Sequence, residues 1–214
     1  MKKSIGGSGV KLMLVAATAL ALASCGQTQP DSAPADEQAE APGGIVMAQF
    51  NEDGSVNQPV GYREWVYIGT PLTPNALNGG AAPFPEFHNV YIEPTAYAVY
   101  DETGEFPQGT QIVKELVLVR ENNNAENGSS SEVSGQGYFQ GEFAGLELTV
   151  KDAERFPDEP GNWAYFSFGH HAPPYGETAQ AFPTASCNAC HEASAETDFV
   201  FTQFYPVLRS AAAN

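Results

Sequence analysis

Apolar and polar residues alternate along much of this chain with the period of two that is typical of β-strands. The clearest strand is predicted at residues 111–120, where Ile112, Lys114, Leu116 and Leu118 share one face. Other extended segments are expected at 88–92, 138–150 and 163–168, the second of these with bulges at Gly141 and Gly145. Residues 62–68 fit a short helix or a strand equally well.

Helices are expected to be few and short. Pro94 is suited to the first turn of a helix over 95–101 that ends before Gly104. The apolar spacing of 193–208 favours a terminal helix that packs on the core, with Pro206 limiting its regularity. The Asn-, Ser- and Gly-rich run 122–137 predicts a long hairpin loop. Together these patterns predict a mainly β domain, an antiparallel sheet with a few short helices.

The N-terminus has the pattern of a secretion signal. Three lysines precede the apolar run 12–23, which is too short to span a bilayer, so we expect a signal peptide at 1–24. The ending Leu22-Ala23-Ser24-Cys25-Gly26 resembles a bacterial lipobox, and Cys25 would then be lipidated. The alternative is ordinary cleavage nearby that leaves a free thiol. The prediction is a protein that faces the periplasm and is held at the membrane by its lipid alone.

Residues 25–44 are mostly small, polar and acidic, which predicts a flexible tether before a folded domain at 45–214. The full chain carries a net charge of −17. Removal of the signal peptide leaves six basic and twenty-six acidic residues, a net charge of −20. Nucleic acid is therefore excluded as a partner, and an acidic surface favours either basic redox partners or simple solubility.

The motif Cys187-Asn188-Ala189-Cys190-His191 is typical of a c-type haem attachment site. Two thiols on one helical turn can form thioethers with the haem vinyl groups, while the histidine supplies an axial ligand. A thioredoxin-like redox pair would need a preceding buried strand, and 182–186 does not have that pattern. A zinc site would have to recruit His88, His170 or His171. A structural disulfide is a further alternative, and haem c is the favoured interpretation.

The distal side of this haem is expected to be open. Met47 is the one methionine left after signal removal, and it lies at the edge of the tether. Any distal protein ligand would therefore be His88, His170 or His171. An open iron site favours small-molecule chemistry or gas binding over simple electron transfer.

Lys114 stands out among the charged residues. The mature chain has two lysines, and Lys151 opens the polar run 151–155, whereas Lys114 lies on an apolar strand face. Burial would disfavour its charged form and make the amine nucleophilic. The alternative is a lysine that snorkels from an edge strand.

Several separate motifs resemble the hydroxylamine-oxidising cytochrome P-460 family, over about 48–209. They are Gly61-Tyr62-Arg63-Glu64-Trp65, Pro71-Leu72-Thr73-Pro74-Asn75, Gly109-Thr110-Gln111-Ile112-Val113-Lys114-Glu115-Leu116, Val150-Lys151-Asp152, Gly161-Asn162-Trp163-Ala164 and Phe201-Thr202-Gln203-Phe204-Tyr205-Pro206. The resemblance implies a mainly β homodimer whose haem is bound by Cys187, Cys190, axial His191 and a Lys114 bond to a porphyrin meso carbon.

The resemblance also implies a distal carboxylate, which we assign to Asp152 as general base. Strand alternation puts Asp152 on the side of Leu146, Leu148 and Val150, and Glu147 on the other side, where we expect solvent. A second family carboxylate is expected just before the first haem cysteine, but 182–184 contains no acid. His88 falls where a basic pocket residue is expected, and the loop 122–137 is longer than the family needs.

The function implied is oxidation of hydroxylamine to nitrous oxide or nitric oxide, with electrons passed to a c-type cytochrome. The runner-up is a nitric oxide-binding protein of the related cytochrome c-prime-beta type, which lacks the cross-link. The third interpretation is a monohaem electron carrier. Lys114 favours the first of these three functions.

Overall fold

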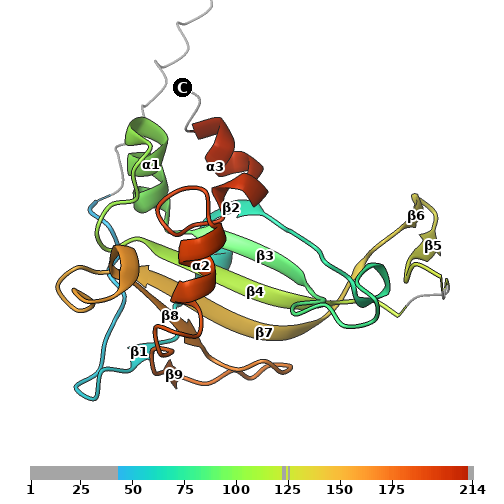
Figure 1. Ribbon diagram of the computed structural model, residues 1–214, viewed down its shortest axis with the longest axis horizontal. Helices are drawn as coiled ribbons and strands as arrows, with labels where there is room; N and C mark the ends of the chain where they lie inside the picture. The colour runs from blue at the N-terminus through green and yellow to red at the C-terminus, as the bar shows by residue number, and fades with distance from the viewer. Residues whose placement is uncertain (1–42, 122–123, 125, 212–214) are drawn as a thin grey trace, which may run out of the picture. The chain divides into compact units, whose positions relative to one another are not determined.

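A five-stranded antiparallel sheet forms the centre of the structure (Figure 1). The computed structural model describes residues 43–121, 124 and 126–211. The strand order is β2-β3-β4-β7-β8. The strands are β2 Val66–Gly69, β3 Phe87–Ile92, β4 Gln111–Val119, β7 Gln140–Lys151 and β8 Trp163–Ser167. The predicted mainly β fold is confirmed.

Strand β4 lies in the middle of this sheet and is buried on both faces. It pairs with β3 on one side and β7 on the other, and its register sets Lys114 opposite Glu147. Ile112 and Leu116 point to one face, while Val113 and Val117 point to the other. The high content of β-branched and aliphatic residues predicted for 111–120 therefore reflects a strand enclosed between two apolar layers.

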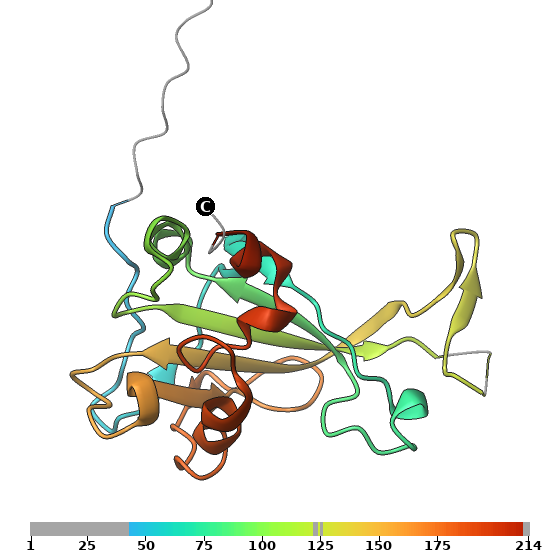
Figure 2. The same cartoon turned by 45° about the horizontal axis from the view of Figure 1, so that its top comes forward.

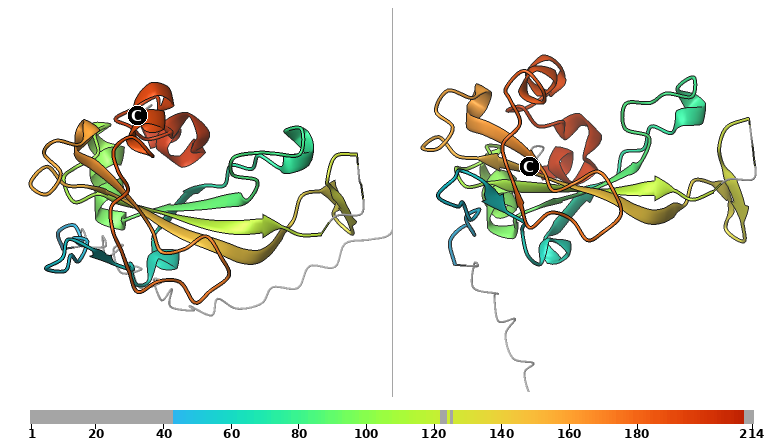
Figure 3. Two further views of the ribbon diagram at one scale, coloured as in Figure 1. Left: turned by 60° about the horizontal axis from the view of Figure 1, so that its bottom comes forward. Right: turned by 90° about the horizontal axis from the view of Figure 1, so that it is seen from below.

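The face that carries Lys114 is called here the helix face, because the three helices lie over it. They are α1 Pro94–Thr103, α2 Asn188–Ser194 and α3 Pro206–Ala211. Their apolar residues join the sheet in a core that includes Tyr100, Trp163 and Leu208. Figure 3 shows the C-terminal helices on one side of the sheet, with the segment that precedes β3 rising on the same side.

The opposite face, called here the back face, carries a second core. It is covered by β1 Val56–Asn57, which pairs with β9 Thr178–Ala179, and by the 3₁₀ helix η1 Tyr62–Glu64. Val113, Leu148 and Phe166 are buried in this core. The other 3₁₀ helices are η2 Asn75–Leu77, η3 Pro160–Asn162 and η4 Thr202–Phe204.

Most predicted elements are confirmed, with adjusted bounds. The segment 62–68 contains both predicted alternatives, because η1 is followed directly by β2. Helix α1 begins at Pro94, the Glu93 carboxylate caps its first turn by accepting from the Ala96 N–H at 2.7 Å, and Gly104 ends it at φ 74°. The β4–β7 register shifts near Gly141 and Gly145, as expected for bulges.

Two predicted segments differ in the structure. The predicted loop 122–137 contains a small hairpin, β5 Ser130–Glu132 and β6 Gly135–Gly137, beyond the ends of β4 and β7 (Figure 2). The predicted helix over 193–208 is wrong, since α2 ends at Ser194 and α3 begins at Pro206. Asp198 and Phe199, at φ 44° and 60°, turn the chain between them.

Residues 43–121, 124 and 126–211 include no helix long and apolar enough to cross a membrane. The predicted signal peptide 1–24 and the lipidation site Cys25 lie outside the described residues, as does nearly all of the tether 25–44.

Candidate haem site

The Cys-x-x-Cys-His motif forms the first turn of α2. Cys187 is the N-terminal cap, and its carbonyl accepts from the backbone N–H of Cys190 and of His191, each at 3.2 Å. The buried Asn188 side chain donates to the Trp163 carbonyl at 2.8 Å and fixes the helix to β8. Among the described residues neither cysteine forms a disulfide, so both thiols are available from one turn.

The His191 ring is held in a defined orientation. Its Nδ1 lies 2.7 Å from the Phe199 carbonyl oxygen. The centre of the ring lies 4.5 Å from that of the Tyr165 ring and 4.6 Å from that of the Phe201 ring. Burial lowers the pKa of His191, against the opposing effect of that hydrogen bond. The neutral ring therefore donates from Nδ1 and leaves the Nε2 lone pair for a metal, which is how metal-binding histidines are usually oriented.

A lysine and a carboxylate lie on the helix face of the sheet. Lys114 Nζ is 2.6 Å from Glu147 Oε2, and both side chains are about three-quarters buried, with 25% and 24% of their surface exposed. The ammonium group also lies 4.5 Å from the centre of the Phe84 ring. The pair joins two neighbouring strands of the sheet at a place partly shielded from solvent.

This pair acts electrostatically on the motif of α2. Burial raises the pKa of the Cys187 thiol, the Glu147 carboxylate raises it further, and the Lys114 ammonium lowers it. The same two groups act on the pKa of His191. The Cys187 thiol, the His191 imidazole and the Lys114–Glu147 pair therefore lie within electrostatic range of one another.

Two thiols, an imidazole with a free Nε2 and an aromatic surround fit a covalently attached haem. Residues 59–202 match the family model described as Cytochrome P460. The chain belongs to this family. It is accordingly a c-type haem protein of the oxidoreductase kind. Among curated proteins no match to the chain is found. Across the described residues no group of three or more His, Cys, Asp or Glu side chains is placed so that it could hold a metal ion.

The assignment of Glu147 to solvent is wrong, because Glu147 pairs with Lys114 on the helix face. The sequence argument for Asp152 used the side of Leu146, Leu148 and Val150, and these residues are buried in the back-face core. That argument therefore places Asp152 away from Lys114, and not with it.

The Asp152 side chain is engaged in its own turn. Its Oδ1 accepts from the backbone N–H groups of Glu154 and Arg155, each at 3.0 Å, and its Oδ2 lies 3.6 Å from the Arg155 guanidinium. No described contact joins Asp152 to Lys114, His191 or either cysteine. Its role as general base stays a prediction.

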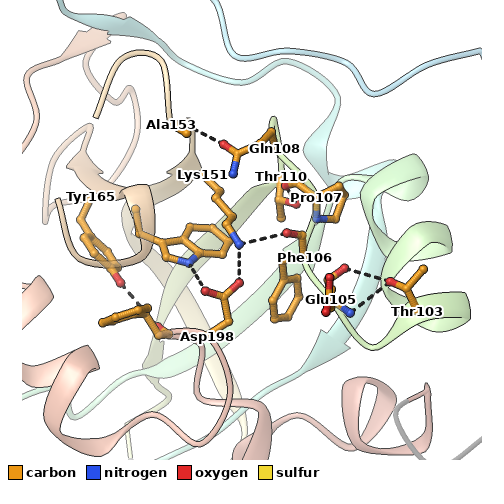
Figure 4. Close-up of polar contacts among 12 residues, drawn as sticks. Thr103, Glu105, Phe106, Pro107, Gln108, Thr110, Lys151, Ala153, Tyr165 and Asp198 are labelled. Carbon is orange, nitrogen blue, oxygen red and sulfur yellow. Dashed lines mark hydrogen bonds and ion pairs between the residues drawn. The ribbon is translucent and has the colours of Figure 1, made fainter. Parts of the chain in front are cut away.

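Lys151 is more buried than the sequence suggested. Its side chain is 13% exposed, and its Nζ donates to Asp198 at 2.5 Å and to the Phe106 carbonyl at 3.0 Å (Figure 4). Asp198 also accepts from the Trp163 indole N–H at 3.3 Å. Burial alone therefore does not single out Lys114; its electrostatic effect on Cys187 and His191 does.

The three histidines considered as distal ligands occupy different places. His88 is on β3 beside Leu116, on the helix face, and its ring lies 5.7 Å from Phe84. His170 pairs with the buried Glu86 at 2.8 Å, with half of its own side chain exposed. His171 is exposed, and its Nδ1 lies 2.7 Å from the Ala172 carbonyl.

Sequence reasoning missed Glu147 and the Phe199 carbonyl as site groups. The register between β4 and β7 reveals Glu147, and that pairing is not visible in either strand alone. The carbonyl carries no side-chain signal at all.

Proposed function

We propose that this protein oxidises hydroxylamine to nitric oxide or nitrous oxide and passes the electrons to a c-type cytochrome. It does so as a homodimer that faces the periplasm on a lipid anchor. The observation that supports this proposal is the placement of the Lys114 amine, 2.6 Å from Glu147 and near enough to the motif of α2 to affect the pKa values of Cys187 and His191.

In this proposal Cys187 and Cys190 would hold the haem through thioethers, and His191 Nε2 would bind its iron. The Phe199 carbonyl keeps the His191 ring in the tautomer that coordination requires. When bound, the haem supplies an iron centre that takes the substrate nitrogen and accepts its electrons.

Lys114 would be the group that bonds to a porphyrin meso carbon during oxidative maturation. That step removes one hydrogen from the amine and one from the meso carbon, and gives two electrons to an external oxidant. An ammonium is not a nucleophile, so the amine must lose a proton before it reacts. The Glu147 carboxylate, 2.6 Å away, is in place to accept that proton. Glu147 can therefore produce the neutral, nucleophilic amine that burial of Lys114 alone was expected to produce.

Glu147 is also the better placed candidate for the general base. After the cross-link forms, Lys114 no longer carries an ammonium beside it, and the carboxylate remains on the helix face. Asp152 is the alternative base implied by the family resemblance. The two are distinguished by Glu147→Gln and Asp152→Asn, since the variant of the true base loses about 100-fold or more in turnover while its haem content and its red-shifted ferrous Soret band are unchanged.

A nitric oxide-binding protein is the second candidate function. It is favoured by the absence of an acid in 182–184, where the family resemblance places a second carboxylate. It is also compatible with a Lys114 side chain that keeps its ion pair with Glu147 and forms no bond to the haem. In that case the haem would bind nitric oxide at an open distal side and hydroxylamine would not turn over.

Peptide mass spectrometry of the mature holoprotein tests the proposal. We expect one haem peptide group that contains Cys187, Cys190 and Lys114, and a ferrous Soret band shifted to the red of ordinary haem c. Lys114→Leu should keep the thioethers, restore the ordinary spectrum and abolish hydroxylamine oxidation while retaining nitric oxide binding. A haem peptide without Lys114 from fully active protein would refute the role of the cross-link.

A further inference from the structure

Glu86 is a buried carboxylate with an unused oxygen. The residue is 5% exposed, and its Oε1 lies 2.8 Å from His170 Nε2. Its Oε2 has no exposed surface and no hydrogen-bond partner among the described residues. Buried carboxylate oxygens without partners are costly, so such an atom in a folded protein calls for a functional explanation.

His88 presents a second buried polar atom of this kind. Its Nε2 has no exposed surface and no partner in the described part of the chain. Burial and the Lys114 charge lower the pKa of His88 to about 4, against the opposing effect of Glu86. At neutral pH the ring is therefore uncharged, able to accept a proton on one nitrogen and release one from the other.

His88 lies on the helix face, near enough to both Lys114 and Glu86 for their charges to act on its pKa. His88 is opposite Leu116 in the β3–β4 register, two residues along β4 from Lys114. Gly145, opposite Leu116 on β7, allows the chain at 169–170 to come close, since a Cβ there would meet the Gly169 carbonyl at 3.1 Å. His170 is thereby brought to Glu86, with half of its side chain in solvent.

We propose that His88, Glu86 and His170 form a proton-transfer route between the haem pocket and solvent. This inference rests on the proposed function, because hydroxylamine oxidation releases protons with its electrons: NH₂OH → NO + 3 H⁺ + 3 e⁻. The electrons leave to the c-type acceptor. In this route the protons pass from Glu147 to His88, then to the inner oxygen of Glu86, and reach solvent from His170. The first two steps need a bridging water, because among the described residues no hydrogen bond joins Glu147 to His88 or His88 to Glu86. These are proton-carrying residues that hold neither substrate nor haem.

The first test measures hydroxylamine oxidation by holoprotein carrying Glu86→Gln or His170→Gly, with His171→Gln as the matched control. We expect Glu86→Gln to lower kcat by about tenfold or more with KM unchanged and with a larger solvent deuterium isotope effect. Added imidazole should restore hydroxylamine oxidation by His170→Gly. The control His171→Gln should oxidise hydroxylamine at the wild-type rate. If the wild type is active and both route variants equal it, the route is refuted; if the wild type does not oxidise hydroxylamine, the proposed function fails.

The second test needs no hydroxylamine. Proton uptake that accompanies reduction of the ferric holoprotein is followed in stopped flow with a pH-indicator dye, because a proton route works in both directions. We expect uptake in step with haem reduction in the wild type and in His171→Gln, and uptake that lags by about tenfold in Glu86→Gln. Equal uptake rates in all three proteins, or no uptake in the wild type, would refute the route.

Discussion

Replacement of Asp198 by Asn tests how strongly the loop after α2 is tied to the sheet. Asp198 accepts from Lys151 Nζ at 2.5 Å and from the Trp163 indole at 3.3 Å. Asn keeps an acceptor oxygen and tolerates the φ of 44° at this position, so the variant removes chiefly the charge. It leaves the Lys151 ammonium, 13% exposed, without a carboxylate partner for its charge.

The size of the effect follows from burial. Breaking a fully buried ion pair costs about 3–5 kcal/mol, whereas an exposed pair costs about 1 kcal/mol or less. The Asp198 side chain is 26% exposed, so an intermediate loss is expected in the free energy of unfolding, about 1–3 kcal/mol. For a protein of this size that corresponds to a fall in Tm of roughly 3–10 °C.

Chemical denaturation of the holoprotein, followed by circular dichroism, measures this loss. Glu132→Gln is the matched control, because the Arg120–Glu132 pair at 2.7 Å is 54% and 30% exposed and should contribute less than about 1 kcal/mol. Lys151→Met combined with Asp198→Asn should lose less than the sum of the single variants, since no unpaired buried charge remains. Additive losses, or a loss for Asp198→Asn no larger than the control's, would refute the reasoning.

Three further changes probe other parts of the fold. Asn188→Ala should lower the free energy of unfolding by about 1–3 kcal/mol, measured by denaturation, because it leaves the buried Trp163 carbonyl without its 2.8 Å donor. Glu115→Gln should lower the free energy of unfolding by about 1–2 kcal/mol in the same assay. The loss is moderate because the carboxylate is 1% exposed but about half of the side chain of its partner Arg63 is exposed to solvent. His88→Leu should abolish a pH dependence of stability between pH 6.5 and about 4. In the wild type the unfolded state binds this proton first, so stability falls as pH falls through that window, by on the order of 3 kcal/mol. Identical pH profiles for the two proteins would contradict it.

The strands could be predicted because their signal is local. Alternation and β-branched content at 111–120 are set by burial on both sides of β4, and Pro94 and Gly104 mark α1 by their own backbone preferences. The C-terminal helix could not be predicted correctly. Its apolar spacing reports packing on the core, which is real, but the chain reverses at Asp198 and Phe199 to bring a carbonyl to His191.

The site was predictable as far as its chemistry lies in one short motif. The spacing predicts Cys187, Cys190 and His191 as the haem-binding residues, and the structure places all three in the first turn of α2. The sheet face on which Glu147 lies was not predictable, because an apolar strand face was expected to mark the haem side. Both faces of this sheet are apolar, so only the pairing of Lys114 with Glu147 across two strands distinguishes them.

Lys114 and Glu115 are consecutive on β4 and therefore point to opposite faces. On the back face, Glu115 accepts from the Tyr62 hydroxyl at 2.6 Å and pairs with Arg63 at 2.5 Å. A shift of β4 by one residue would exchange the two, placing the carboxylate toward α2 and the ammonium among the buried groups of the back face. The contacts of Glu115 stabilise one register, and that register is the one that aims Lys114 at the haem site. The chemistry proposed for Lys114 thus depends on an ion pair on the far side of the sheet from it.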